Sequence, residues 1–316
     1  MEYTKRPLII KEQIEQLKNR GLLINNEKSA ESYLSNINYY RLRAYTFPFQ
    51  DNQINDHRFL RDDIKFEDII DLYCFDRRLR ALIFNVLEKI EIALRTKFIY
   101  EYSIDTNNSH WFMDKSIYFD PDKQIITENG YITLYDLLMG KIKEDVKRSD
   151  EDFIQHYNQK YSYPVIPPVW MTLETLSFGN LSKLIANLDC KSEPYKKIAL
   201  SLGLSNPLIL KNWIYSFSVL RNYCAHHSRI WNRRFHVELK MPYNTKFPFI
   251  DKQDLNKIFK NKIFSILCCL QYINKIISPQ SDFRNNLLEM IENGGKLVKT
   301  KDMGFPENWE SFGVWQ

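Results

Sequence analysis

The chain has 316 residues and a net charge of +5, and 44% of its residues are hydrophobic and 14% aromatic. So many apolar and aromatic side chains exclude a disordered chain, and nine glycines are too few for the many turns of a β-sandwich, so we expect helices. The most apolar run, residues 263–273, is far shorter than the roughly 20 residues of a membrane span, and charged residues replace the apolar run of a secretory signal. We therefore expect a cytoplasmic protein with no membrane partner.

The first 60 residues predict a small N-terminal helical unit. A helix over 11–19 ends at Gly21, a residue suited to a left-handed cap. A second helix is expected over 28–43, with Tyr39, Tyr40 and Arg41 near its end. Pro48 and the polar residues that follow it close the unit.

The next part of the chain predicts the first half of a helical core that extends over 61–280. No glycine or proline interrupts residues 66–100, and apolar residues recur there at three- and four-residue spacing, which predicts one long amphipathic helix. Glu91 and Arg95 stand at i,i+4 in it, either as a solvated pair or as polar support for a site. A polar loop is expected over 101–130 and a helix over 131–145.

The second half of the core is also helical in pattern. Ser149 and Asp152 predict a capping box for a further helix, residues 163–168 contain three prolines and are expected to be extended, and a helix interrupted at Gly179 is expected over 170–187. Asn206 and Pro207 predict the start of a helix that runs to about residue 232. The last long helix is expected over 251–278, and residues 281–316 form a tail packed on or beside the core. The fold class is an all-α helical bundle.

The five cysteines are odd in number and show no CxxC spacing, which argues against a disulfide framework or a zinc ribbon. We expect four of them to be small core residues, namely Cys74, Cys224, Cys268 and Cys269. No metal and no cofactor are expected.

The helix that begins at Pro207 carries two separate stripes on a wheel of 100° per residue. The core stripe consists of Leu210, Trp213, Phe217, Leu220 and Cys224. The second stripe lies about 150–200° round the helix and consists of Asn222, His226, Arg229 and Arg233. Arg221 falls between the stripes, nearer the core edge. His227 lies about 50° from the core stripe and is expected to be packed, whereas His226 stands on the polar face.

A basic cluster surrounds His226. Five basic residues and one acidic residue stand between Arg221 and Lys240, which favours a phosphate-rich partner. A histidine gives and takes protons near neutral pH, and an arginine offers a fork of donors to phosphate oxygens. Together they suit the cleavage of RNA by its own 2′-hydroxyl without a metal. Because an Arg and a His at this spacing arise by chance in many helices, a solvated basic face stays open at this point.

The segment from Arg221 to Asn232 resembles the signature of the Abi-D/Abi-F abortive-infection family, a branch of the HEPN superfamily. The superfamily motif is an arginine, four to six residues and a histidine, often with an asparagine after the arginine. Arg221, Asn222 and His226 fill these positions. Further segments resemble the family in the same order, around residues 13–22, 33–42, 72–77, 90–96, 170–182 and 303–309.

The resemblance implies a HEPN-type helical bundle that acts as a metal-independent endoribonuclease toxin in anti-phage defence. It also implies a homodimer whose two motifs face one cleft, and restraint by a partner such as a small non-coding guard RNA. The expected catalytic residues are Arg221, His226 and Asn222, with Asn222 positioning Arg221 or the substrate. The expected RNA-binding residues are Arg229, Arg233 and Arg234.

Two other functions stay open on the sequence. One is a non-catalytic RNA-binding regulatory module whose basic stripe holds phosphates. The other is a metal phosphoesterase that uses His226, His227 and His236, which is the weaker reading because adjacent histidines point about 100° apart on a helix.

Overall fold

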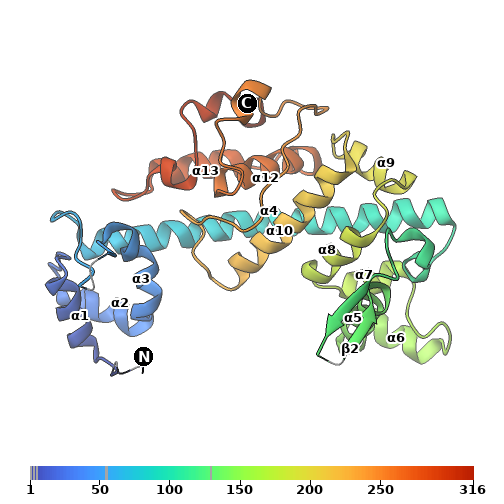
Figure 1. Ribbon diagram of the computed structural model, residues 1–316, viewed down its shortest axis with the longest axis horizontal. Coiled ribbons are helices and arrows are strands. Elements are labelled where there is room, and N and C mark those ends of the chain that lie inside the picture. The colour runs from blue at the N-terminus through green and yellow to red at the C-terminus, as the bar shows by residue number, and fades with distance from the viewer. Residues whose placement is uncertain (1, 3, 5, 54–55, 129) are drawn as a thin grey trace.

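The computed structural model describes residues 2, 4, 6–53, 56–128 and 130–316. These residues form thirteen α-helices and two short strands, so the prediction of an all-α fold is confirmed. The longest helix, α4 (Phe66–Thr106), runs through most of the molecule, and the other helices gather around it (Figure 1). It extends beyond the predicted residue 100 and ends at Asn107, whose φ of 47° is left-handed.

Three short helices cover one end of α4 (Figure 1): α1 (Ile10–Asn19), α2 (Glu27–Asn36) and α3 (Tyr39–Thr46). The prediction of one helix over 28–43 is wrong, because Ile37 is extended and the Asn38 side chain accepts the backbone N–H of Tyr40 at 2.7 Å. Asn38 thereby caps a separate helix, α3, which packs against α4.

Toward the other end of α4 lie two antiparallel strands and five helices: β1 (Gln124–Thr127), β2 (Gly130–Thr133), α5 (Leu134–Arg148), α6 (Asp152–Lys160), α7 (Val169–Thr175), α8 (Phe178–Asn187) and α9 (Glu193–Ser201). The loop predicted over 101–130 is wrong at both ends, because α4 takes up its first residues and β1 lies within it. The helix predicted from residue 131 begins at Leu134, where the Thr133 side chain accepts the N–H of Asp136.

Capping explains two further differences from the predicted elements. The helix expected over 170–187 is two helices, α7 and α8, because the Ser177 hydroxyl accepts the N–H of Asn180 and starts α8. The capping box of Ser149 and Asp152 is wrong, because α6 begins at Asp152 after Glu151, and the Ser149 hydroxyl accepts the N–H of Glu151 instead. The predicted non-helical segment over 163–168 is confirmed.

Helix α10 (Pro207–Ala225) crosses α4 and packs against α8, α9 and α12 (Figure 1). It starts where predicted, since the Asn206 side chain accepts the N–H of Leu208 at 3.0 Å. All five residues of the predicted core stripe are buried. The predicted end near residue 232 is wrong, because the helix stops at Ala225 and His227 takes a left-handed φ of 55°.

The C-terminal part forms α11 (Lys252–Leu255), α12 (Ile263–Ile277) and α13 (Phe283–Glu292). A single helix over 251–278 is therefore wrong, and α12 is not the last helix. The break has a physical cause, since the carbonyl groups of Lys260 and Asn261 accept the N–H groups of Leu239 and Phe235 from another segment. Six short 3-10 helices also occur in the described chain: Phe47–Phe49, Trp111–Met113, Lys115–Ile117, Thr300–Met303, Trp309–Ser311 and Gly313–Trp315.

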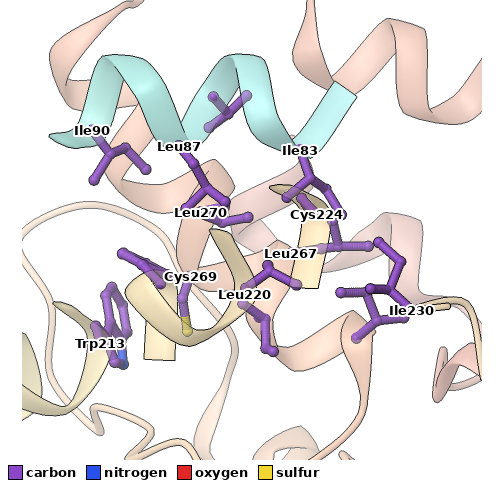
Figure 2. Packing of buried hydrophobic residues seen from close by; sticks show 14 of the residues in the cluster. Ile83, Leu87, Ile90, Trp213, Leu220, Cys224, Ile230, Leu267, Cys269 and Leu270 are labelled. Carbon is purple, nitrogen blue, oxygen red and sulfur yellow. The ribbon is translucent and has the colours of Figure 1, made fainter. Parts of the chain in front are cut away.

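The hydrophobic core runs along α4, and one part of it lies where α4, α10 and α12 meet. Figure 2 shows side chains from the three helices facing one another, among them Leu87, Leu220 and Leu267. Each fully buried side chain of this size stabilises the fold by about 1.5–3 kcal/mol. Cys224, Cys268 and Cys269 belong to this core, as predicted, while Cys74 is half-buried against it.

None of the helices in the described ranges is long and apolar enough to cross a membrane.

Candidate functional site

The C-terminal end of α10 exposes the two adjacent histidines. His226 caps the helix, and its backbone N–H donates to the carbonyl of Asn222 at 2.9 Å. His227 follows at positive φ, which turns the chain away from the helix axis. Both side chains are exposed, so the prediction that His227 is packed in the core is wrong. A wheel angle has no meaning for a residue beyond the last helical turn.

A buried carboxylate on α4 holds the segment that follows. Asp76 Oδ1 accepts the backbone N–H groups of Ile230 at 3.1 Å and Trp231 at 2.8 Å. Its Oδ2 accepts the Tyr45 hydroxyl of α3 at 2.7 Å and an N–H of Arg80. Burial raises the pKa of Asp76, and attraction to Arg80 opposes this. Because all four groups donate, the carboxyl has to be ionised to satisfy them.

Helix α3 faces this segment and contacts it directly. Arg41 donates from Nη1 to the carbonyl of His227 at 2.8 Å, and Arg229 donates from Nη1 to the carbonyl of Ala44 at 2.5 Å. Between the two walls lies a cleft of about 420 Å³. We call it the arginine cleft, because its lining includes Arg41, Arg229, Arg233, His226 and His227.

The residues that line the arginine cleft carry net positive charge, although the buried carboxylate of Asp76 behind them attracts Arg229. The lining itself contains no carboxylate. Burial and the nearby Arg233 lower the pKa of Arg229, whose buried Nε has no hydrogen-bond partner among the described residues. Arg233 stacks over the Tyr223 ring at 4.4 Å and donates from Nε to the Arg229 carbonyl at 2.7 Å. Fixed guanidinium groups with unused donors suit a bound phosphate.

Arg221 lies on a different face of α10, against α4. Its guanidinium carbon is 5.7 Å from the centre of the Phe84 ring, and its buried Nε has no hydrogen-bond partner in the described part of the chain. Burial raises the pKa of the nearby Glu91, while the charges of Arg95 and Arg221 act to lower it. Arg221 therefore lies near the half-buried Glu91 and outside the lining of the arginine cleft.

The Glu91–Arg95 pair is structural support and not a solvated helix pair. Arg95 is buried, and it donates to Glu91 at 2.8 Å, to Glu174 at 3.0 Å and to the carbonyl of Leu176 at 3.0 Å. These bonds tie α4 to α7 next to Arg221. Of the two readings left open by the sequence, this geometry favours support for a site.

The structure thus divides the six candidate residues. His226, Arg229 and Arg233 line the arginine cleft, whereas the remaining three lie outside its lining, namely Arg221, Asn222 and Arg234. Asn222 and Arg234 are exposed. Burial is the main cause that lowers the pKa of Lys262, and the positive charge of Arg234 lowers it further. The predicted stripe of Asn222, His226, Arg229 and Arg233 is wrong as a helical face, because the last two residues follow the end of α10.

Sequence reasoning missed the residues that build the cleft from outside α10. Asp76 and Arg80 stand at i,i+4 on an otherwise apolar face, and this spacing is the signal that could have found them. Arg41 lies in the family-like segment 33–42, but no signal predicts its contact with His227, which joins residues 186 positions apart.

Metal ligands do not gather around the histidines. In residues 2, 4, 6–53, 56–128 and 130–316, no group of three or more histidine, cysteine, aspartate or glutamate side chains is placed to share a metal ion. His226, His227 and His236 therefore do not form such a group.

Comparison with known protein families supplies the identity. A family model described as Abi-like protein matches residues 32–232, which include both walls of the arginine cleft up to Asn232. The chain belongs to the Abi-like protein family. Membership indicates a role in abortive infection, a form of antiviral defence. No curated protein and no solved structure matches this Abi-like protein.

Proposed function

We propose that this Abi-like protein is a HEPN-type, metal-independent endoribonuclease that acts as an abortive-infection toxin. The observation that carries the proposal is an exposed histidine, His226, in a cleft lined by three arginines and no carboxylate. Such a cleft attracts a phosphodiester and gives it a proton-transfer group. A small RNA that occupies the same cleft without being cut would restrain the toxin.

The chemistry follows from these groups. His226 takes the proton of a ribose 2′-hydroxyl, and the oxygen attacks the adjacent phosphorus. The bond from phosphorus to the 5′-oxygen of the next nucleotide breaks, and that oxygen leaves with a proton from a second acid. The products are a 2′,3′-cyclic phosphate and a free 5′-hydroxyl. Guanidinium groups stabilise the charge on the pentacoordinate phosphate.

A second copy of the chain would supply the missing groups. In one chain Arg221 packs against Phe84 on α4, whereas His226 faces α3. A two-fold axis beside the end of α10 would bring the Arg221 of each copy near the His226 of the other. It would also provide two histidines, one as the base and one as the acid.

The first prediction is that Arg221→Ala and His226→Ala each abolish RNA cleavage and cell toxicity. Loss of a proton-transfer group costs at least about 10²-fold in rate. Matched controls are Arg78→Ala and His156→Ala, because both side chains are exposed on other helices and outside the arginine cleft. Cleavage by the His226 variant at the wild-type rate would contradict the assignment.

The products and the metal dependence test the same prediction. Cleavage is expected to persist in EDTA and to leave a 2′,3′-cyclic phosphate, and RNA with 2′-O-methyl at the cut site is expected to resist. A magnesium-dependent 5′-phosphate product would overturn the mechanism. RNA binding that depends on Arg229 and Arg233 with no turnover would instead identify a regulatory RNA-binding module.

A further inference from the structure

We propose that α3 supplies a nucleotide subsite for single-stranded RNA, in which a phosphate lies among the guanidinium groups of the arginine cleft and its unpaired base stacks on Tyr40. The proposal deepens the proposed function, because it names the substrate class of the same cleft. It concerns the N-terminal wall, which the motif on α10 does not contain.

The first observation that supports this subsite is the exposure of Tyr40. Tyr40 lines the arginine cleft and is 79% exposed, although it is a large aromatic residue on a short helix. Its neighbour Tyr39 is half-buried and its hydroxyl accepts an N–H of Arg20 at 2.8 Å. Tyr39 therefore has a role in the fold. The ring of Tyr40 packs on no other ring among the described residues, so its face is open to a ligand.

The second observation is that two arginine side chains are held in fixed positions beside this ring. Arg41 is held in place by the His227 carbonyl, and Arg229 is held by the Ala44 carbonyl one turn further along α3. Each of these bonds uses only the Nη1 atom of its arginine, so each guanidinium keeps other N–H groups for a phosphate. An aromatic face next to a positively charged groove is the arrangement by which proteins bind single strands.

The chemistry of the cleft favours a single strand over a duplex. Its volume of about 420 Å³ lies within the roughly 300–1,000 Å³ of small-ligand sites, so it accommodates one nucleotide. In a duplex both faces of each base are covered by neighbouring bases, and only an unpaired base can stack on a side chain. Tyr40 therefore favours unpaired RNA over paired RNA, whereas the arginines bind the phosphates of both single-stranded and double-stranded RNA.

The test measures binding without cleavage. A short fluorescein-labelled single-stranded RNA carrying 2′-O-methyl groups, and the duplex of the same sequence, are titrated with the full-length protein and followed by anisotropy. Tyr40→Ala is expected to weaken binding of the single strand about 5- to 150-fold, the effect of removing one stacked base. Tyr40→Phe is expected to bind like the wild type. The affinity for the duplex is expected to change less than about twofold, because a paired base cannot stack on Tyr40.

Two controls make the result specific. Tyr131→Ala on β2 removes a tyrosine that is equally exposed, at 76%, and lies outside the cleft, so it is expected to have no effect. Arg233→Gln is expected to weaken single-strand and duplex binding alike. The subsite is overturned if Tyr40→Ala binds the single strand like the wild type, if it weakens both forms equally, or if the wild type binds neither.

The outcome separates this subsite from the proposed function. If binding depends on Tyr40 but unmodified RNA is never cut, the subsite stands and the ribonuclease is wrong. If unmodified RNA is cut at the same rate and bound with the same affinity by wild type and Tyr40→Ala, the ribonuclease stands and the subsite is wrong.

Discussion

His227 illustrates how one backbone angle decides the role of a residue. Its φ of 55° lies in the left-handed region, where a side chain with a Cβ is strained. This angle ends α10, exposes both histidines and presents the His227 carbonyl to Arg41. The sequence singled out His226 as a candidate residue but could not predict this turn, because no glycine marks it.

Substitution of His227 tests that geometry. His227→Gly is expected to change the free energy of unfolding by less than about 1 kcal/mol, because glycine adopts positive φ without strain but gains freedom in the unfolded chain. His227→Val is expected to lower it by about 1–2 kcal/mol, since a β-branched residue is disfavoured there. Urea unfolding gives both values. Equal stability of the two variants would argue against the left-handed turn.

The helices show which parts of a fold a sequence can predict. Helices α4 and α10 were predicted with their buried faces because their apolar spacing continues over many residues. The breaks at Asn38 and Ser177 were missed because a single side chain, bonded to a nearby backbone N–H, competes with the helix there. The walls of the cleft could not be predicted, since they come from elements far apart in the chain.

Asp76 joins three of these elements, and its removal is expected to be costly. Asp76→Ala leaves Arg80 buried without its partner and two backbone N–H groups without an acceptor. The free energy of unfolding is expected to fall by about 3–5 kcal/mol. Asp71→Ala, at an exposed position of the same helix, is the matched control and is expected to change it by less than about 0.5 kcal/mol. Chemical denaturation of both variants measures the difference.

At the scale of the molecule, α4 connects two groups of elements. Helices α1 to α3 lie at one end of it, and the two strands with α5 to α9 lie toward the other end (Figure 1). The hydrophobic core is continuous along it, and it includes residues from α1 to the last tryptophan. The proposed catalytic motif lies near the crossing of α4 and α10, and α3 reaches it from the N-terminal end. One chain completes the arginine cleft but leaves Arg221 outside its lining.

The active unit is therefore expected to be a homodimer. Light scattering is expected to give twice the 38.0 kDa mass of one chain under assay conditions, and specific activity is expected to fall on dilution together with the dimer fraction. The dimer is expected to survive in His226→Ala, which removes only an exposed side chain. Full activity at concentrations where only monomers are present would contradict a shared site.

The two walls of the arginine cleft also determine when the cleft can form during synthesis of the chain. One wall comes from residues 38–45 and the other from residues 226–233, so a nascent chain has no cleft until about three quarters of its 316 residues have left the ribosome. Domains fold as their residues emerge, and the Asp76 contacts with Ile230 and Trp231 can form only at that late stage. On the proposed function, unfinished or prematurely terminated chains lack the cleft and are therefore expected to be harmless to the cell that makes them.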